Sequence, residues 1–176
     1  MKNLLVFLAC FPLLYASAQQ SIPADSWLLE ASTGFVNSGQ FTSSNPPTTG
    51  FGLITSDGFT AYSLGGEAAY FVLDNFGIKA GLGYSDFDGF NFFTYKVGAK
   101  YYLGGRMPFQ VDITGISSDS FFDDPLWLGI QGGYAIFLNE VVALEPQVRY
   151  NISINDATDS GLFEIRGGFT IFFNKN

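Results

Sequence analysis

Charged side chains in this chain fall on one side of an alternating pattern. In the stretch 142–152 the apolar set is Val142, Leu144, Pro146, Val148, Tyr150 and Ile152, and the polar set between them is Glu145, Gln147, Arg149 and Asn151. The stretch 162–173 alternates in the same way. Successive side chains of a β-strand point to opposite faces. The pattern therefore predicts a sheet with one apolar face and one charged face.

Eight segments carry this period of two: 27–36, 60–72, 76–85, 92–103, 109–116, 126–137, 141–153 and 162–173. Every formally charged residue in them lies on one parity, and the opposite parity carries none. A tilted strand needs about 9 to 11 residues to cross a bilayer, so only 109–116 is marginal. No helical periodicity competes with these segments.

The connections between the segments alternate in length. Those at 73–75, 104–107 and 138–140 are short, whereas those at 37–59, 86–91, 117–125 and 154–161 are longer. Short turns at one end and longer loops at the other are typical of an up-and-down membrane barrel. The sequence predicts an all-β fold, an eight-stranded antiparallel transmembrane β-barrel with both termini on the side of the short turns.

The first residues have the pattern of an export signal. Lys2 precedes an apolar run, and Ala16-Ser17-Ala18 resembles a cleavage site. We expect a signal peptide over residues 1–18 and a single barrel domain over 19–176. An alternative is lipoprotein processing at Cys10, because Leu-Ala-Cys faintly resembles a lipobox.

The rest of the sequence fits strands in a membrane. No later stretch has the roughly 18 consecutive apolar residues of a spanning helix, so any span must be built from strands. Aromatic residues make up 18% of the chain and many lie near segment ends, where two interfacial girdles would sit. Glycines gather on the charged parity, which suits a cramped interior: Gly65, Gly77, Gly81, Gly83, Gly98, Gly129, Gly133 and Gly168. The alternative is a soluble lipocalin-like barrel with the apolar face turned inward.

On the membrane interpretation, the interior holds five acids and five bases. They are Glu30, Glu67, Asp112, Glu145 and Glu164 against Lys79, Lys96, Lys100, Arg149 and Arg166. A charge in a narrow interior must be paired or hydrated. An eight-stranded barrel is just wide enough for its own side chains to fill, so we expect a structural ion-pair network. A narrow polar pore is the alternative.

The residue types present limit the chemistry. The chain has no histidine, which excludes Ser-His-Asp and Cys-His catalysis and barrel enzymes that use a catalytic histidine. We therefore expect no catalytic residue. No cofactor motif is present, so we also expect no cofactor. The net charge of −8 argues against nucleic acid as a partner.

The longer connections are acidic. They contain eight aspartates and neither lysine nor arginine: Asp57, Asp86, Asp88, Asp119, Asp123, Asp124, Asp156 and Asp159. Such a rim attracts divalent cations or basic partners. Asp119, Asp123 and Asp124 are the candidate calcium ligands, although the EF-hand spacing is absent, and a simple solvated acidic surface is the alternative. The segment 38–59, rich in Ser, Thr, Gly and Pro, is either a mobile recognition loop or a tolerated insertion.

Pro146 does not fit a continuous strand. It lies in the middle of the segment 141–153 and has no N–H to donate to a neighbouring strand. We expect a bulge or a local break in pairing there.

Two stretches carry a family resemblance. The segment 166–173, RGGFTIFF, resembles the C-terminal assembly signal of outer-membrane barrels, although three further residues follow it; 144–150, LEPQVRY, is similar to their penultimate strand. With the export signal and eight strands, the chain resembles small bacterial outer-membrane β-barrels of the OmpA/OmpX type.

This resemblance implies a monomer in the outer membrane. It implies periplasmic termini, contact with outer-membrane lipids, and recognition of the C-terminal strand by the barrel assembly machinery. The expected role is non-enzymatic: envelope integrity, or surface interaction and adhesion through the acidic loops. The alternative is a channel for small solutes or hydrophobic molecules.

Overall fold

The computed structural model describes residues 21–35, 49–56, 59–87, 89–117, 125–155 and 161–173. The expected signal peptide therefore lies outside the described residues. The described chain is built from ten strands: β1 (Trp27–Phe35), β2 (Gly52–Ser56), β3 (Phe59–Leu73), β4 (Phe76–Phe87), β5 (Phe90–Leu103), β6 (Met107–Ser117), β7 (Leu126–Gly133), β8 (Ile136–Phe137), β9 (Val142–Ser153) and β10 (Leu162–Phe173). Among these residues, no helix is long and apolar enough to span a membrane.

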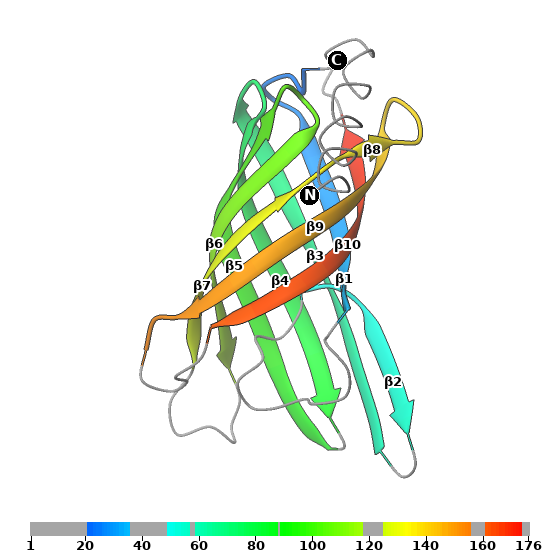
Figure 1. The fold of residues 1–176 in the computed structure, drawn as a ribbon, viewed down its shortest axis with the longest axis vertical. Coiled ribbons are helices and arrows are strands. Elements are labelled where there is room, and N and C mark those ends of the chain that lie inside the picture. The colour runs from blue at the N-terminus through cyan, green and yellow to red at the C-terminus, as the bar shows by residue number, and fades with distance from the viewer. Residues whose placement is uncertain are drawn as a thin grey trace, which may run out of the picture.

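The sheet closes on itself (Figure 1). The strand order is β1-β10-β9-β7-β6-β5-β4-β3-β2, and β1 also pairs with β3. β7 and β8 both pair with β9 and act as two parts of one wall strand. The wall is therefore a closed, eight-stranded antiparallel barrel, which confirms the predicted fold class.

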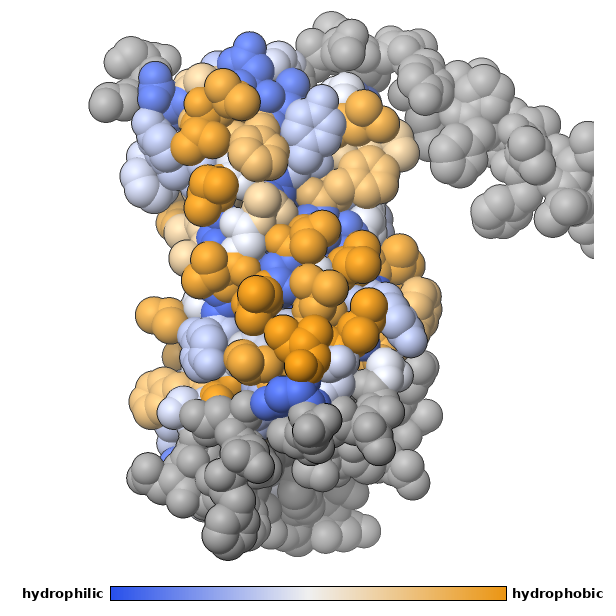
Figure 2. Space-filling view, turned by 90° about the vertical axis from the view of Figure 1, so that its left-hand side faces the viewer, coloured by the Kyte–Doolittle hydropathy of each residue, from blue (hydrophilic) through white to orange (hydrophobic). Residues whose placement is uncertain are grey.

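The apolar parity faces outward. Leu64 and Leu82 are more than two-thirds exposed, at 71% and 73%, whereas the charged parity is buried. Figure 2 shows hydrophobic side chains across the middle of one face of the wall. The lipocalin-like alternative needs these side chains inside and is wrong. An outward apolar belt is what a barrel in hydrocarbon requires.

One strand and one connection differ in length from the sequence-based prediction. The marginal fifth segment, expected over 109–116, is an 11-residue strand, β6. The connection expected over 86–91 is only residues 88–89, because Phe87 pairs with Phe90. Gly89 has φ 91, a conformation that glycine adopts without steric cost, and its N–H donates to Asp86 Oδ1. This connection is therefore a tight turn.

The connection expected over 37–59 is not one loop. Residues 52–56 form β2, which pairs with the beginning of β3. Figure 1 shows this hairpin extending past the wall beyond β1. β1 and β3 pair directly only across Trp27–Glu30 and Glu67–Tyr70. The chain between β1 and β3 thus enters the barrel structure and is more than a surface insertion.

Pro146 interrupts pairing on one side only. Toward β10, Pro146 stays in register opposite Gly167, so the expected bulge is absent there. On the other side, Tyr134 N–H donates to the Pro146 carbonyl, and proline cannot return the bond. The wall strand is interrupted here between β7 and β8, and toward its other neighbour Ala135 N–H donates to the Arg106 carbonyl. The predicted local break is therefore present on the β7 side.

The short-turn end of the interior is closed by an apolar plug. It consists of Ile22, Leu28, Ala69, Phe71, Tyr102, Ala135, Ala143 and Phe172, with Phe137 packed against them. Residues 21–26 run across this end: Ile22 N–H donates to Asn75 Oδ1, and Asp25 N–H donates to the Phe71 carbonyl. The alternating pattern predicted which residues face inward. It did not predict that the inward residues at the short-turn end form an apolar layer.

Candidate functional site

All ten charged residues predicted for the interior are buried there. Their exposed fractions range from 0% for Lys100 and Glu145 to 7% for Glu164. Each strand of the wall contributes at least one of them except β7, β8 and the β2 hairpin arm. The structure separates them into two groups, which we name by their cations.

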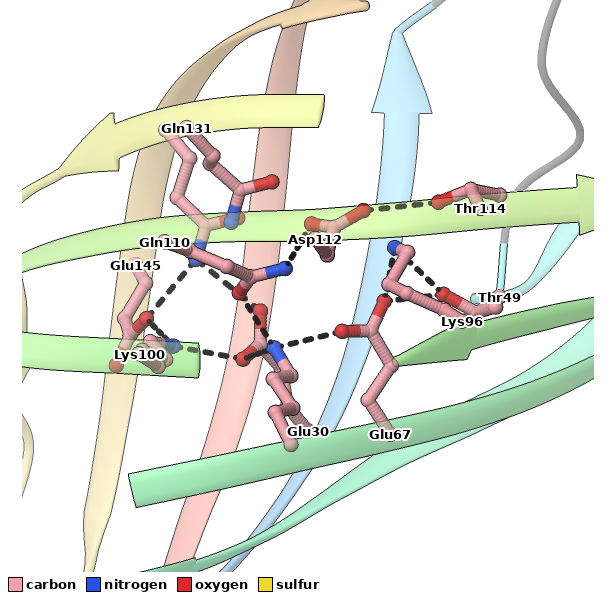
Figure 3. A network of polar contacts seen from close by, with 12 residues as sticks. Glu30, Thr49, Glu67, Lys96, Lys100, Gln110, Asp112, Thr114, Gln131 and Glu145 are labelled. Atoms are coloured by element: carbon pink, nitrogen blue, oxygen red, sulfur yellow. Dashed lines mark hydrogen bonds and ion pairs between the residues drawn. The ribbon is translucent and has the colours of Figure 1, made fainter. Parts of the chain in front are cut away.

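The lysine cluster is Glu30, Glu67, Glu145, Lys79, Lys96 and Lys100, three acids and three bases. Glu30 and Glu67 lie directly opposite each other in the β1–β3 register. Lys79 Nζ lies 2.6 Å from a carboxylate oxygen of each. Lys100 Nζ lies 2.7 Å from both Glu30 and Glu145. Figure 3 shows Glu30, Glu67, Glu145 and Lys100 pointing toward one another from different strands.

Lys96 completes the lysine cluster on the loop side. Its Nζ lies 2.6 Å from Glu67 Oε1 and donates to Thr49 Oγ1 at 3.0 Å. The Thr49 hydroxyl in turn donates to Glu67 Oε1. Thr49 comes from the chain that precedes β2 and is fully buried.

The arginine cluster is Asp112, Arg149, Glu164 and Arg166, two acids and two bases on β6, β9 and β10. Arg149 Nη1 and Nη2 each donate to one Asp112 oxygen at 2.6 Å, a bidentate pair. Glu164 is held more loosely: its Oε2 lies 3.8 Å from Arg149 Nε and 3.7 Å from Arg166 Nε. Asn151 Nδ2 donates to the same oxygen at 2.7 Å.

Two glutamines extend the network, one between the clusters and one within the lysine cluster. Gln110 accepts from Lys79 Nζ at 2.9 Å and donates to Asp112 Oδ2 at 2.6 Å, which links the two clusters. Gln147 donates to Glu30 and Glu145. Each cluster is formally neutral, so these ten residues give the interior paired charge and no net charge.

Glycines make the room that these long side chains occupy. A Cβ on Gly129 would lie 1.9 Å from Arg149 Nη2, and a Cβ on Gly98 would lie 2.4 Å from Asp112 Cβ. A Cβ on Gly81 would lie 2.8 Å from Glu67 Cγ. The inward glycines therefore leave room that the side chains of Arg149, Asp112 and Glu67 fill, as expected for a cramped interior.

The candidate calcium ligands Asp119, Asp123 and Asp124 lie outside the described residues. Within the described ranges, no group of three or more acidic, histidine or cysteine side chains could hold a metal ion. Of the eight loop aspartates, only Asp86 is described. It stands on the outward parity of β4 beyond the apolar belt, opposite Tyr62.

Sequence reasoning did not single out three residues that complete the network. Tyr102 donates its hydroxyl to Glu145 Oε1 at 2.6 Å, and its ring lies 5.0 Å from Lys100 Nζ. Asn151 was placed on the polar parity but given no role. Thr49 lies outside every alternating segment, so no periodic signal could have identified it.

Two solved structures are similar to this one. The first is the crystal structure of the N-terminal β-barrel domain of Pseudomonas aeruginosa OprF, at 16% identity, covering 88% of this chain and 100% of that chain, with a TM-score of 0.58. The second belongs to a study of the de novo design of transmembrane β-barrels, at 14% identity, 87% and 99% coverage, and a TM-score of 0.50. No protein-family model and no curated protein matches the chain. The chain therefore has the fold of the small eight-stranded outer-membrane β-barrels, as the sequence resemblance implied.

Proposed function

We propose that the protein is a non-enzymatic, monomeric barrel of the bacterial outer membrane that supports envelope integrity or surface interaction. The observation that carries this proposal is the filled interior. The apolar plug and the lysine cluster follow one another along the axis. The side chains of both are buried, and those of the lysine cluster are paired with one another. A barrel blocked in this way is suited to a structural or adhesive role, with its loops as the working surface.

Conductance in planar bilayers tests the filled interior. The wild-type protein is expected to give no steady open level, because eight-stranded barrels hold little beyond their own side chains. A reproducible open level that changes in Lys96→Ala would contradict the proposal and would favour the alternative, a narrow channel for small solutes. Val97→Ala, on the outward face, is the matched control.

The membrane location has a separate test. Both termini are proposed to lie in the periplasm, with the acidic loops outside the cell. The folded protein is expected in the outer-membrane fraction and to migrate faster on a gel before boiling than after it. A protein soluble without detergent would refute this location.

Two partner proposals follow from the same orientation. The outward side chains Phe169 and Phe173 of β10 are exposed and are available to the barrel assembly machinery, so Phe173→Ser is expected to reduce the folded fraction in cells. The acidic loops are proposed to attract divalent cations or a basic surface partner. Calcium titration calorimetry on the folded barrel, with Asp123→Asn as the variant, tests the cation: absence of heat would exclude it.

A further inference from the structure

The chain preceding β2 enters the interior and touches the lysine cluster. We call residues 49–51 the strap. Thr49 is fully buried, and its hydroxyl accepts from Lys96 Nζ and donates to Glu67 Oε1. The strap is tied to the wall through a backbone bond in which Phe51 N–H donates to the Ser32 carbonyl at 3.2 Å. Figure 3 shows Thr49 beside the ends of Lys96 and Glu67.

On the β3–β4 side, glycines line the wall beside the strap. Pairing brings Gly65 beside Gly83 and Gly81 beside Glu67 on the inward parity. A Cβ on Gly65 would lie 2.9 Å from the Thr49 carbonyl carbon, and one on Gly81 would lie 3.4 Å from Thr49 Cγ2. The strap therefore fills a space that glycines leave open on the β3–β4 side of the interior.

Three buried hydroxyl groups lie at inward positions near this space. Ser32, Ser85 and Thr94 are at most 1% exposed, and within the described part of the chain their side-chain oxygens have no hydrogen-bond partner. Thr94 pairs with Gly83, one inward position beyond Lys96 toward the loop end. A buried hydroxyl without a partner costs free energy. These groups can offer hydrogen bonds that the strap itself leaves unused.

We propose that this space, vacated when the strap withdraws, is a binding cup for a small neutral polyhydroxylated solute of about monosaccharide size. The Thr49 hydroxyl stands in for one ligand hydroxyl, accepting from Lys96 and donating to Glu67. Ser32, Ser85 and Thr94 then contact the other hydroxyls. A charged ligand is disfavoured because the Glu67–Lys96 pair is already neutral, and an added charge would be buried without compensation. The apolar plug and the rest of the lysine cluster close the other end, so the cup binds without conducting.

The strap's movement provides the first test. Thr49→Cys in a Cys10→Ser background, as the full chain in detergent micelles, is treated with a small water-soluble thiol reagent. Glucose is expected to speed labelling, with saturation, because sugar in the cup displaces residue 49. Dioxane, which accepts but does not donate hydrogen bonds, is expected to have no effect. Thr55→Cys, on the exposed part of β2, is the control whose labelling rate stays constant.

A second variant separates binding from misfolding. Thr49→Val keeps the shape of the side chain but removes the competing hydroxyl, so glucose is expected to bind roughly tenfold more tightly, as about one hydrogen bond of competition is lost. Titration followed by the amide NMR signals of Thr94 and Lys96 measures this affinity. Labelling of Thr49→Cys that ignores glucose, or equal affinity in Thr49→Val and wild type, would overturn the proposal.

Discussion

The lysine cluster and the arginine cluster neutralise buried charge in different ways. In the lysine cluster, Lys79 and Lys100 each share one Nζ between carboxylates on different strands, so Lys79 connects β1, β3 and β4. In the arginine cluster, the planar guanidinium of Arg149 is matched to one carboxylate, Asp112. A lysine ammonium is a point charge that several carboxylates can approach, whereas arginine forms a fixed fork. The first arrangement braces the wall, and the second fixes a local geometry.

The bracing matters most at the β1–β3 seam. These strands pair over only four residues each, whereas β3 and β4 pair over most of their length. Glu30 and Glu67 face each other across the seam, and like charges directly opposite destabilise a sheet. Lys79 lies between them and converts a repulsive pair into a bridge. The comparison predicts that the lysine cluster is the more sensitive to substitution.

The largest effect is expected for Lys79→Met. The substitution leaves Glu30 and Glu67 buried and facing each other without their shared cation, at a cost of about 3 to 5 kcal/mol in the free energy of unfolding. Urea unfolding in detergent, followed by gel mobility, measures it. Ile78→Met, the outward neighbour, is the matched control with little change. Adding Glu67→Gln to Lys79→Met is expected to recover part of the loss; no recovery would mean that the repulsion is unimportant.

Gly129→Ala tests how tightly the arginine cluster fills its space. The new methyl group would collide with the Arg149 guanidinium and force it off Asp112, costing about 2 kcal/mol. Gly132→Ala is the control, since its Cβ would lie 3.7 Å from the nearest Phe109 ring atom. If the two alanine variants unfold at the same urea concentration, the arginine cluster has room that the structure does not show.

Tyr102→Phe tests the link between the lysine cluster and the apolar plug. The ring stays in the plug, but Glu145 loses a hydrogen bond of 2.6 Å, which is expected to cost about 1.5 kcal/mol. Phe71→Tyr is the matched comparison, because it adds a hydroxyl at a neighbouring plug position instead of removing one. This variant should not stabilise the barrel. If Tyr102→Phe leaves the free energy of unfolding unchanged, the bonds from Lys100 and Gln147 are sufficient for Glu145.

The smallest effect is expected for Arg166→Met. Its Nε lies 3.7 Å from Glu164, beyond hydrogen-bond distance, and Asn151 still donates to that carboxylate. The lost attraction is offset by the removed cost of burying the cation. The free energy of unfolding should therefore change by less than about 1 kcal/mol. A loss as large as that of Lys79→Met would remove the distinction between the two clusters.

The alternating pattern was sufficient to predict the wall and the inward set of charges. A period of two assigns a face to each residue, and Glu30, Lys79 and Arg149 followed from it directly. It could not predict partners, because these depend on how strands far apart in sequence are staggered around the barrel. Lys100, for example, bridges β1 and β9, neither of which adjoins β5 in the wall.

The remaining differences have local causes. Residues 49–51 have no periodicity, and their position depends on glycines in β3 and β4 that leave space for them. The turn at Gly89 is shorter than expected because a positive φ allows Phe87 and Phe90 to pair. The split between β7 and β8 shows that the missing N–H of Pro146 affects one neighbouring strand and leaves the other intact.

The pairing of β1 with both β10 and β3 also sets the order in which the barrel can be completed. Trp27 pairs with Phe173, so the first and last strands of the wall meet. Until β10 is present, β1 and β9 each expose an edge of unpaired backbone groups, which hydrocarbon does not tolerate. Insertion of single strands one by one would therefore be uphill at every step. The membrane-embedded state becomes accessible only when nearly the whole sequence is available to form a ring.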